Sequence, residues 1–167
     1  DWNPSDLGSK TYKGNPKYFA NMVAYMDFSI GRIVDKIEQL GLSENTIVIF
    51  TADNGTDQPI VSMMGDVAVE GGKGKTTDNG THVPLIVNWK GAVKAGVSNT
   101  TLVDFSDFFP TLCEAAGIKI DVNLDLDGIS FYPQLLGKES FKRKWIHTWY
   151  NREGGSSPLA ATTEWVR

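Results

Sequence analysis

The sequence predicts an α/β fold in which helices sandwich a mainly parallel sheet. A long amphipathic helical pattern is followed by an almost entirely apolar strand, a long polar loop, a second apolar strand and a further helical pattern. Strands of such continuous apolar character are typical of a sheet that is covered on both faces. Two strands make a poor sheet alone, because each leaves a row of backbone groups unpaired. We therefore expect the 167 residues to form part of a larger domain.

The first predicted element is a helix over residues 16–41. Apolar residues recur along it at spacings of three and four, and Gly41 ends the pattern. Pro16 suits the first helical turn, where its missing N–H costs nothing, and Asn15 is a possible cap.

Two buried strands are predicted next, "TIVIFT" over residues 46–51 and "VPLIVNW" over residues 83–89. Between them, residues 53–82 are polar and rich in glycine. A loop of this length in a compact domain suggests a function beyond connecting two strands.

A second helix is predicted in "DFSDFFPTLCEAAG", beginning at Ser106 or Asp107. Pro110 then lies in its first turn and Gly117 lies just beyond its end. Cys113, the one cysteine of the chain, falls on the apolar pattern, so we interpret it as a small buried side chain rather than a nucleophile.

The segment "DLDLDG" resembles the start of a calcium-binding EF-hand loop. Counted from Asn123, however, the twelfth position is Gln134, where an EF-hand needs a bidentate glutamate. We predict a turn instead, followed by a short helix that Ser130 caps and that ends at Leu136. The run "KWIHTWY" (residues 144–150) predicts a third strand.

Composition excludes several classes of function. The chain is 41% hydrophobic and 22% charged with a formal net charge of −4, which is typical of a globular protein and gives no electrostatic reason to bind nucleic acid. No apolar run approaches the roughly 20 residues of a membrane span. The first ten residues lack the basic and apolar regions of a signal peptide, and a single cysteine does not identify a compartment.

The first candidate site residues are Asp53 and Asn54, which follow the first strand directly. In open α/β sheets, ligands bind beyond the carboxyl ends of strands. One anionic and one neutral oxygen donor suit Ca²⁺ or Mg²⁺ better than zinc. The alternative is that Asp-Asn-Gly is turn chemistry alone, since such turns are common.

The second candidate is Lys73, in "EGGKGKTTDNGTHVP". Glycines at 71, 72 and 74 leave room around it, so that an anion could approach both its ammonium and the backbone. The pattern is not a P-loop, because Lys73 is followed by Gly74 instead of Ser or Thr. A flexible surface loop is the alternative, and Lys75 is expected to be the solvated lysine of the pair.

Three segments together resemble the latter part of the catalytic domain of type I sulfatases, in the alkaline phosphatase-like superfamily. These are "MVAYMDFSIGRIVDKIEQLGLSENTIVIFTADNGT", "GGKGKTTDNGTHVPLIVNWKG" and "DGISFYPQLLG". The resemblance extends from about Tyr18 to Tyr150. It implies that residues 1–167 are a C-terminal portion of one catalytic domain, and that residues after about 150 begin a C-terminal subdomain.

The resemblance implies a role for each candidate residue. Asp53 and Asn54 would be ligands of one active-site Ca²⁺, and Lys73 would contact the sulfate. The implied reaction is hydrolysis of a sulfate ester by a formylglycine nucleophile, assisted by positive charge around the sulfate. The substrate would be a sulfate ester, such as a sulfated glycan, in a periplasmic or secreted protein.

The sequence also departs from the family. The Cys/Ser-x-Pro-x-Arg motif that carries the nucleophile is absent, since Cys113 is followed by Glu-Ala-Ala and the segment Ser156–Ala160 lacks the arginine. The formylglycine would therefore lie outside this chain, and we expect residues 1–167 to be inactive alone and able to self-associate. His82 and His147 are interpreted as structural.

Two alternatives remain open. A phosphatase or phosphodiesterase of the same superfamily would show Asp-His-Gly where this chain has Asp53-Asn54-Gly55, because zinc prefers a nitrogen donor. A non-catalytic binding domain could keep the fold without the nucleophile.

Overall fold

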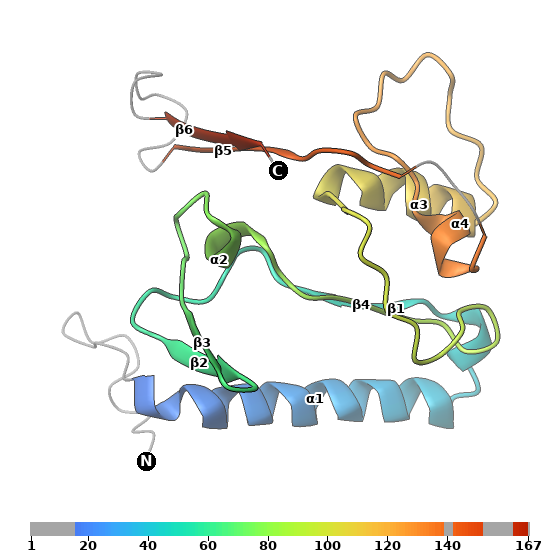
Figure 1. The fold of residues 1–167 in the computed structure, drawn as a ribbon. Coiled ribbons are helices and arrows are strands. Elements are labelled where there is room, and N and C mark those ends of the chain that lie inside the picture. Colours follow the sequence, from blue (N-terminus) through green and yellow to red (C-terminus); the bar gives the residue numbers. More distant parts are fainter. Residues whose placement is uncertain (1–15, 139–141, 152–161, 167) are drawn as a thin grey trace.

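The computed structural model describes residues 16–138, 142–151 and 162–166 (Figure 1). The helical elements are η2 (Pro16–Tyr18), α1 (Phe19–Gln39), η3 (Ser43–Asn45), α2 (Asp78–Thr81), η4 (Phe105–Asp107), α3 (Phe108–Ala115) and α4 (Tyr132–Leu135), where η marks a 3-10 turn. The strands are β1 (Val48–Thr51), β2 (Val61–Met64), β3 (Val67–Glu70), β4 (Leu85–Asn88), β5 (His147–Asn151) and β6 (Thr162–Val166).

The first predicted helix is confirmed as α1, preceded by the 3-10 turn that contains Pro16. Its end follows from Gly41, which has a φ of 68°. The N–H of Gly41 donates to Glu38 O at 2.9 Å and that of Leu42 to Ile37 O at 3.0 Å, so the last carbonyls are satisfied by a Schellman motif. The expected cap Asn15 lies outside the described residues.

The two apolar strands are confirmed as β1 and β4, but they pair antiparallel, with Thr51 opposite Leu85 and Val48 opposite Asn88. Every pairing among the described strands is antiparallel, in three two-stranded sheets. The prediction of a mainly parallel sheet is therefore wrong for these strands. The physical reason is the connection: it leaves β1 and enters β4 at the same end of the pair, without a crossover helix.

The connection from β1 to β4 contains structure that the sequence analysis did not predict. Strands β2 and β3 form a hairpin, in which Met64 lies opposite Val67 and Gly65 has a φ of 61° at the first turn position. A two-residue turn beginning with glycine suits the twist of an antiparallel hairpin. The single helical turn α2 then leads into β4.

The β1–β4 pair lies between two groups of elements. Helix α1 runs along one side of it, whereas α3, α4, β5 and β6 lie on the other (Figure 1). An open groove of about 790 Å³ separates α1 from the pair, lined by Phe19, Val23, Ile30, Val34, Phe50 and Ile86 among others. Phe131, 4% exposed, is the one buried residue of the hydrophobic core in the described part of the chain. Most of the apolar surface of α1 is thus uncovered.

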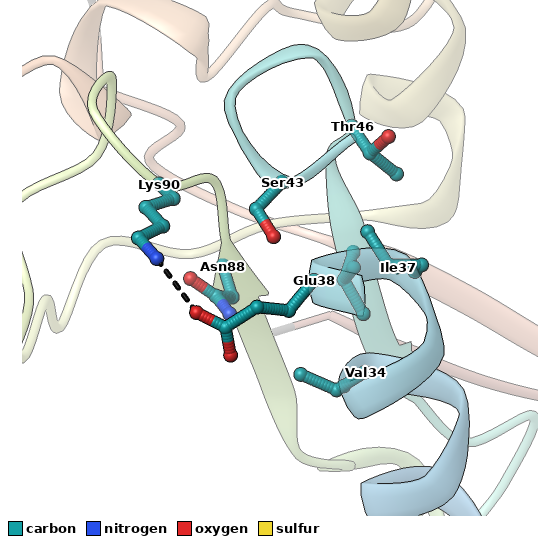
Figure 2. A pocket seen from close by; sticks show the side chains of 8 residues that line it. Val34, Ile37, Glu38, Ser43, Thr46, Asn88 and Lys90 are labelled. Atoms are coloured by element: carbon teal, nitrogen blue, oxygen red, sulfur yellow. Dashed lines mark hydrogen bonds and ion pairs between the residues drawn. The ribbon is translucent and has the colours of Figure 1, made fainter. Parts of the chain in front are cut away.

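The far end of this groove, away from Asp53, is held closed by polar contacts. Lys90 Nζ donates to Glu38 Oε1 at 2.8 Å, and Trp89 Nε1 donates to Glu44 O at 2.7 Å. Figure 2 shows the Lys90–Glu38 pair bridging β4 and α1 beside a pocket of about 120 Å³. The hydrogen bond from Lys90 lowers the pKa of the exposed Glu38 carboxyl.

A buried polar cluster joins α3 to the segment that leads into β5. The Asp107 carboxylate, which is 2% exposed, accepts hydrogen bonds from both Nε and Nη2 of Arg143. It also accepts from the backbone N–H groups of Ile129 at 2.7 Å and Asp104 at 2.8 Å. Burial of both charges is possible because each is paired and hydrogen-bonded. This contact with Asp107 raises the pKa of Arg143.

The second predicted helix is confirmed as η4 and α3, with Pro110 in the first turn of α3 and Gly117 beyond its end at a φ of 69°. Its cap differs from the prediction. Asp104, not Ser106 or Asp107, accepts from the free backbone N–H groups and forms a capping box. Asp104 lies two residues before Ser106, so it caps the 3-10 turn η4 rather than the α-helix α3. Cys113, which we expected to be buried, is half-buried.

The predictions of a third strand and of a short last helix hold with small changes. The third strand is confirmed as β5. The short helix α4 begins after Phe131, and the Ser130 hydroxyl accepts from the Tyr132 N–H at 3.2 Å from just outside the cap position. In the described residues, no helix has the length and hydropathy that crossing a bilayer requires.

Candidate functional site

Asp53 and Asn54 lie where β1 ends, two and three residues beyond Thr51. Asp53 is exposed and Asn54 is half-buried. Within the described part of the chain, neither side chain makes a hydrogen bond or an ion pair, whereas the nearby Asp57 carboxylate accepts from the Gln58 N–H at 3.1 Å. The oxygens of Asp53 and Asn54 are therefore available to a ligand.

Lys73 lies in the loop between β3 and α2, and this loop is bonded to the segment that carries Asp53 and Asn54. The backbone N–H groups of Gly72 and Lys73 both donate to Thr56 O, each at 2.9 Å. Gln58 Nε2 donates to Lys73 O at 3.1 Å. The structure thus brings the two predicted parts of the site together through the backbone.

The Lys73 ammonium itself is left without a partner among the described residues, and its side chain is exposed. Lys75, two residues further along, is also exposed. Neither lysine is held in an ion pair within the described ranges, so the ammonium group of each could bind an anion. Only Lys73 lies in the part of the loop that is bonded to the segment after β1.

The glycines around Lys73 have a different role from the one expected. Gly71 and Gly72 are buried, and their N–H groups are used by Ile60 O and Thr56 O. A Cβ on Gly71 would stand 2.0 Å from Asp57 O, and one on Gly72 would stand 2.6 Å from the Asn79 carbonyl carbon. These glycines make room for neighbouring backbone, so an anion at Lys73 meets the side chain and not these amides.

Two further glycines complete this packing. A Cβ on Gly55 would stand 1.8 Å from Asn79 O, and one on Gly80 would stand 2.0 Å from Lys75 O. Gly55 N donates to Gly80 O at 2.8 Å. The segment after β1, the Lys73 loop and α2 therefore form one tightly packed backbone unit.

His82 and His147 each have an acidic neighbour. His82 Nδ1 is 3.2 Å from Asp78 Oδ2, one helical turn earlier, and both side chains are exposed. His147 Nε2 is 3.8 Å from Glu164 Oε2, across the β5–β6 pair. Local contacts account for both histidines.

Tyr150 is a site neighbour that the sequence analysis missed. Its hydroxyl oxygen lies 3.6 Å from the point where a Cβ on Gly74 would stand. No local signal could have revealed this contact, because it joins β5 to a loop far earlier in the chain.

The oxygen donors fit part of a calcium site. Asp53 and Asn54 supply a carboxylate and an amide oxygen, which are hard ligands of the kind that Ca²⁺ prefers. In the described segments no group of three or more His, Cys, Asp or Glu residues could hold a metal ion. Since Ca²⁺ takes about six to eight oxygen ligands, further ligands would have to come from elsewhere.

Comparison with known proteins decides the family. Residues 6–118, well over half of the chain, match the sulfatase family. The chain belongs to the sulfatase family. This confirms the resemblance seen in the sequence, and it relates the chain to sulfuric ester hydrolases.

Three relatives illustrate the extent of the match. The chain is 36% identical over 134 residues to the uncharacterized sulfatase YdeN of Escherichia coli K12, covering 79% of this chain and 23% of that protein. It is 37% identical over 120 residues to human arylsulfatase A, covering 71% and 23%. It is 31% identical over 129 residues to mouse N-acetylgalactosamine-6-sulfatase, covering 75% and 24%. The chain thus spans less than a quarter of each of these sulfatases.

Solved structures show the same partial correspondence. The PsFucS1 sulfatase of Pseudoalteromonas sp. superposes with a TM-score of 0.64 at 29% identity, over 84% of this chain and 31% of that one. The protein Ps i-CgsB superposes with a TM-score of 0.74 at 25% identity, over 99% and 36%. The described fold therefore corresponds to part of a sulfatase domain.

Proposed function

We propose that this chain is the latter portion of a sulfatase catalytic domain, and that the full-length enzyme hydrolyses sulfate esters. Family membership supports the reaction class. The observation that carries the proposal is the pair of hydrogen bonds from Gly72 N and Lys73 N to Thr56 O. They tie the backbone of Lys73 to the segment that carries Asp53 and Asn54, which supports a site that combines one ammonium group with two oxygen donors.

In this proposal Asp53 and Asn54 are two ligands of a calcium ion. Calcium supplies positive charge that stabilises the sulfate as negative charge develops on its oxygens. Asp53 provides the anionic ligand, which contributes most of the electrostatic attraction. Asn54 provides a neutral oxygen. It adds no negative charge to the site, which favours the binding of an anionic substrate.

Lys73 binds a sulfate oxygen through its ammonium group. Its exposed side chain is free to reach a ligand, while its backbone is fixed by Thr56 and Gln58. A fixed backbone reduces the entropy lost when the side chain is ordered. The lysine thereby neutralises charge and orients the ester for attack.

The nucleophile lies outside residues 1–167 in this proposal, because the Cys/Ser-x-Pro-x-Arg motif is absent from them. The family resemblance implies a formylglycine in the remainder of the catalytic domain. Without it, Lys73 and the two calcium ligands can bind an anion but cannot perform the covalent step.

The substrate we propose is the sulfate ester of a cyclic alcohol, for example a sulfated sugar. Relatives at more than 30% identity carry the names arylsulfatase and N-acetylgalactosamine-6-sulfatase, which denote sulfate esters of an aryl group and of a sugar, both ring-containing.

A turnover assay tests this division of roles. The full-length enzyme should hydrolyse 4-nitrophenyl sulfate or a sulfated monosaccharide in the presence of Ca²⁺, and purified residues 1–167 should hydrolyse neither. Calcium-dependent hydrolysis by residues 1–167 would mean that they contain an unrecognised nucleophile. Failure of the full-length enzyme on a broad panel of sulfate esters would refute the proposed activity.

A further inference from the structure

Strand β5 brings an aromatic side chain to the loop that carries Lys73. The hydroxyl oxygen of Tyr150 lies 3.6 Å from the position of a Cβ on Gly74, and its ring carbon Cζ lies 3.9 Å from the same point. Gly74 directly follows Lys73 and has a φ of 80°. The tyrosine therefore lies beside the residue that directly follows Lys73 in the chain.

The position of Tyr150 is fixed from two sides. Towards the C-terminus, β5 pairs with β6, and Tyr150 lies opposite Thr163. Towards the N-terminus, the segment entering β5 is anchored by Arg143, which bonds to the buried Asp107 carboxylate and to Asp127 O at 3.1 Å. An isolated β-bridge between Leu102 and Arg143 adds a backbone contact.

The tyrosine also has free capacity for a ligand. Its side chain is 41% exposed, and its hydroxyl has no hydrogen-bond partner in the described ranges. A tyrosine offers a flat apolar ring for stacking and a hydroxyl that can donate or accept. Trp149, 60% exposed, points to the opposite face of β5, because successive side chains alternate along a strand.

We propose that Tyr150 contacts the alcohol portion of the sulfate ester and contributes to substrate specificity. This inference rests on the proposed function, because Lys73 defines where the sulfate lies. With the sulfate at the Lys73 ammonium, Tyr150 is the neighbouring side chain that can pack against the ring to which the ester is attached. Its hydroxyl then bonds to a hydroxyl group of the ring, which a sugar has and the 4-nitrophenyl ring lacks.

Two variants of the full-length enzyme separate stacking from hydrogen bonding. Tyr150→Ala removes the ring and should raise KM about tenfold for both 4-nitrophenyl sulfate and N-acetylgalactosamine 6-sulfate, with kcat changed little, as expected for lost ground-state binding. Tyr150→Phe keeps the ring and should raise KM for the sugar sulfate alone. Trp149→Ala, on the opposite face of the same strand, is the control and should leave both KM values within about twofold.

The outcomes distinguish this inference from the proposed function. Unchanged KM values in a folded Tyr150→Ala enzyme that still hydrolyses both esters would overturn the role of Tyr150 and leave the sulfatase activity standing. Equal losses in Tyr150→Ala and Trp149→Ala would also overturn it, because they would indicate a structural effect of β5. Absence of any hydrolysis by the unaltered enzyme would overturn both.

Discussion

At the scale of single residues, the candidate site is distinguished by side chains that have no partners in the described structure. Asp53, Asn54 and Lys73 have no side-chain partners within the described part of the chain, while the backbone N–H groups of Gly55, Gly72 and Lys73 are hydrogen-bonded. The close packing of this backbone requires glycine at position 72, since any side chain there would collide with Asn79. Fixed backbone with free side chains is the arrangement that a preorganised binding site needs.

Replacing Asp53, the proposed anionic ligand of calcium, tests the metal assignment. Asp53→Ala in the full-length enzyme should abolish activity and weaken calcium binding, because the one charged ligand of the pair is lost. Asn54→Asp should perturb both less, since an oxygen donor remains. Removal of calcium with a chelator should inactivate the unaltered enzyme, and added Ca²⁺ should restore it.

Calorimetric titration of calcium together with a turnover assay measures these effects. Asp57→Ala is a matched control, since Asp57 lies in the same segment but its carboxylate accepts from the Gln58 N–H. Normal calcium affinity and turnover in Asp53→Ala would show that the Asp-Asn pair is turn chemistry alone.

At the scale of elements, periodicity and the glycines that end helices could be predicted from the sequence, whereas N-caps, strand pairing and close contacts could not. The spacing of apolar residues and Gly41 correctly predict α1, and apolar runs correctly predict β1 and β4. The direction of pairing depends on the path of the connection, which has no local signal. The β2–β3 hairpin does have one, the Gly65-Asp66 turn between short apolar runs, and it was overlooked.

Candidate site residues show the same division. Asp53 stands out in the sequence because a carboxylate directly follows an apolar strand. Lys73 stands out because a charged side chain lies among glycines. Their connection through Thr56, and the approach of Tyr150 to Gly74, depend on tertiary contacts between distant segments. Pattern analysis therefore identifies the participants but not their arrangement.

We expect the stability of the described fold to depend strongly on the buried ion pair between Asp107 and Arg143. Asp107→Ala leaves the Arg143 guanidinium, which is 10% exposed, without its partner. Loss of one member of a buried pair costs about 3 to 5 kcal/mol. We expect a clear drop in the thermal unfolding midpoint of the full-length enzyme.

The exposed Asp125→Ala serves as the control for this variant and should change stability by less than about 0.5 kcal/mol. Similar unfolding midpoints for the two variants would contradict the structural role of the Asp107–Arg143 pair.

At the scale of the whole molecule, the described residues have more apolar surface than they bury. Phe131 is the one buried core residue of hydrophobic character among them, while Met22, Tyr25, Phe28 and Ile33 of α1 are between 59% and 71% exposed. The groove of about 790 Å³ beside α1 is open. Because the chain spans less than a quarter of its relatives, we propose that the remainder of the sulfatase domain covers this face.

Purified residues 1–167 should accordingly bind the dye 1-anilinonaphthalene-8-sulfonate and self-associate, because large exposed apolar patches bind such probes and one another. Dye fluorescence and light scattering after size-exclusion chromatography measure both properties. The full-length enzyme is the control and should bind much less dye per molecule. A monomeric preparation of residues 1–167 that binds no dye would contradict this view of the groove.

The most direct test of the central claim compares two lysines of one loop. If Lys73 holds a sulfate oxygen, Lys73→Ala in the full-length enzyme should lower kcat/KM about a hundredfold, which corresponds to roughly 3 kcal/mol of lost transition-state stabilisation. Lys75→Ala, an equally exposed cation two residues away, should change kcat/KM by less than about threefold. Equal effects of the two substitutions, or no effect of Lys73→Ala, would show that the loop is merely basic and that Lys73 does not bind the sulfate.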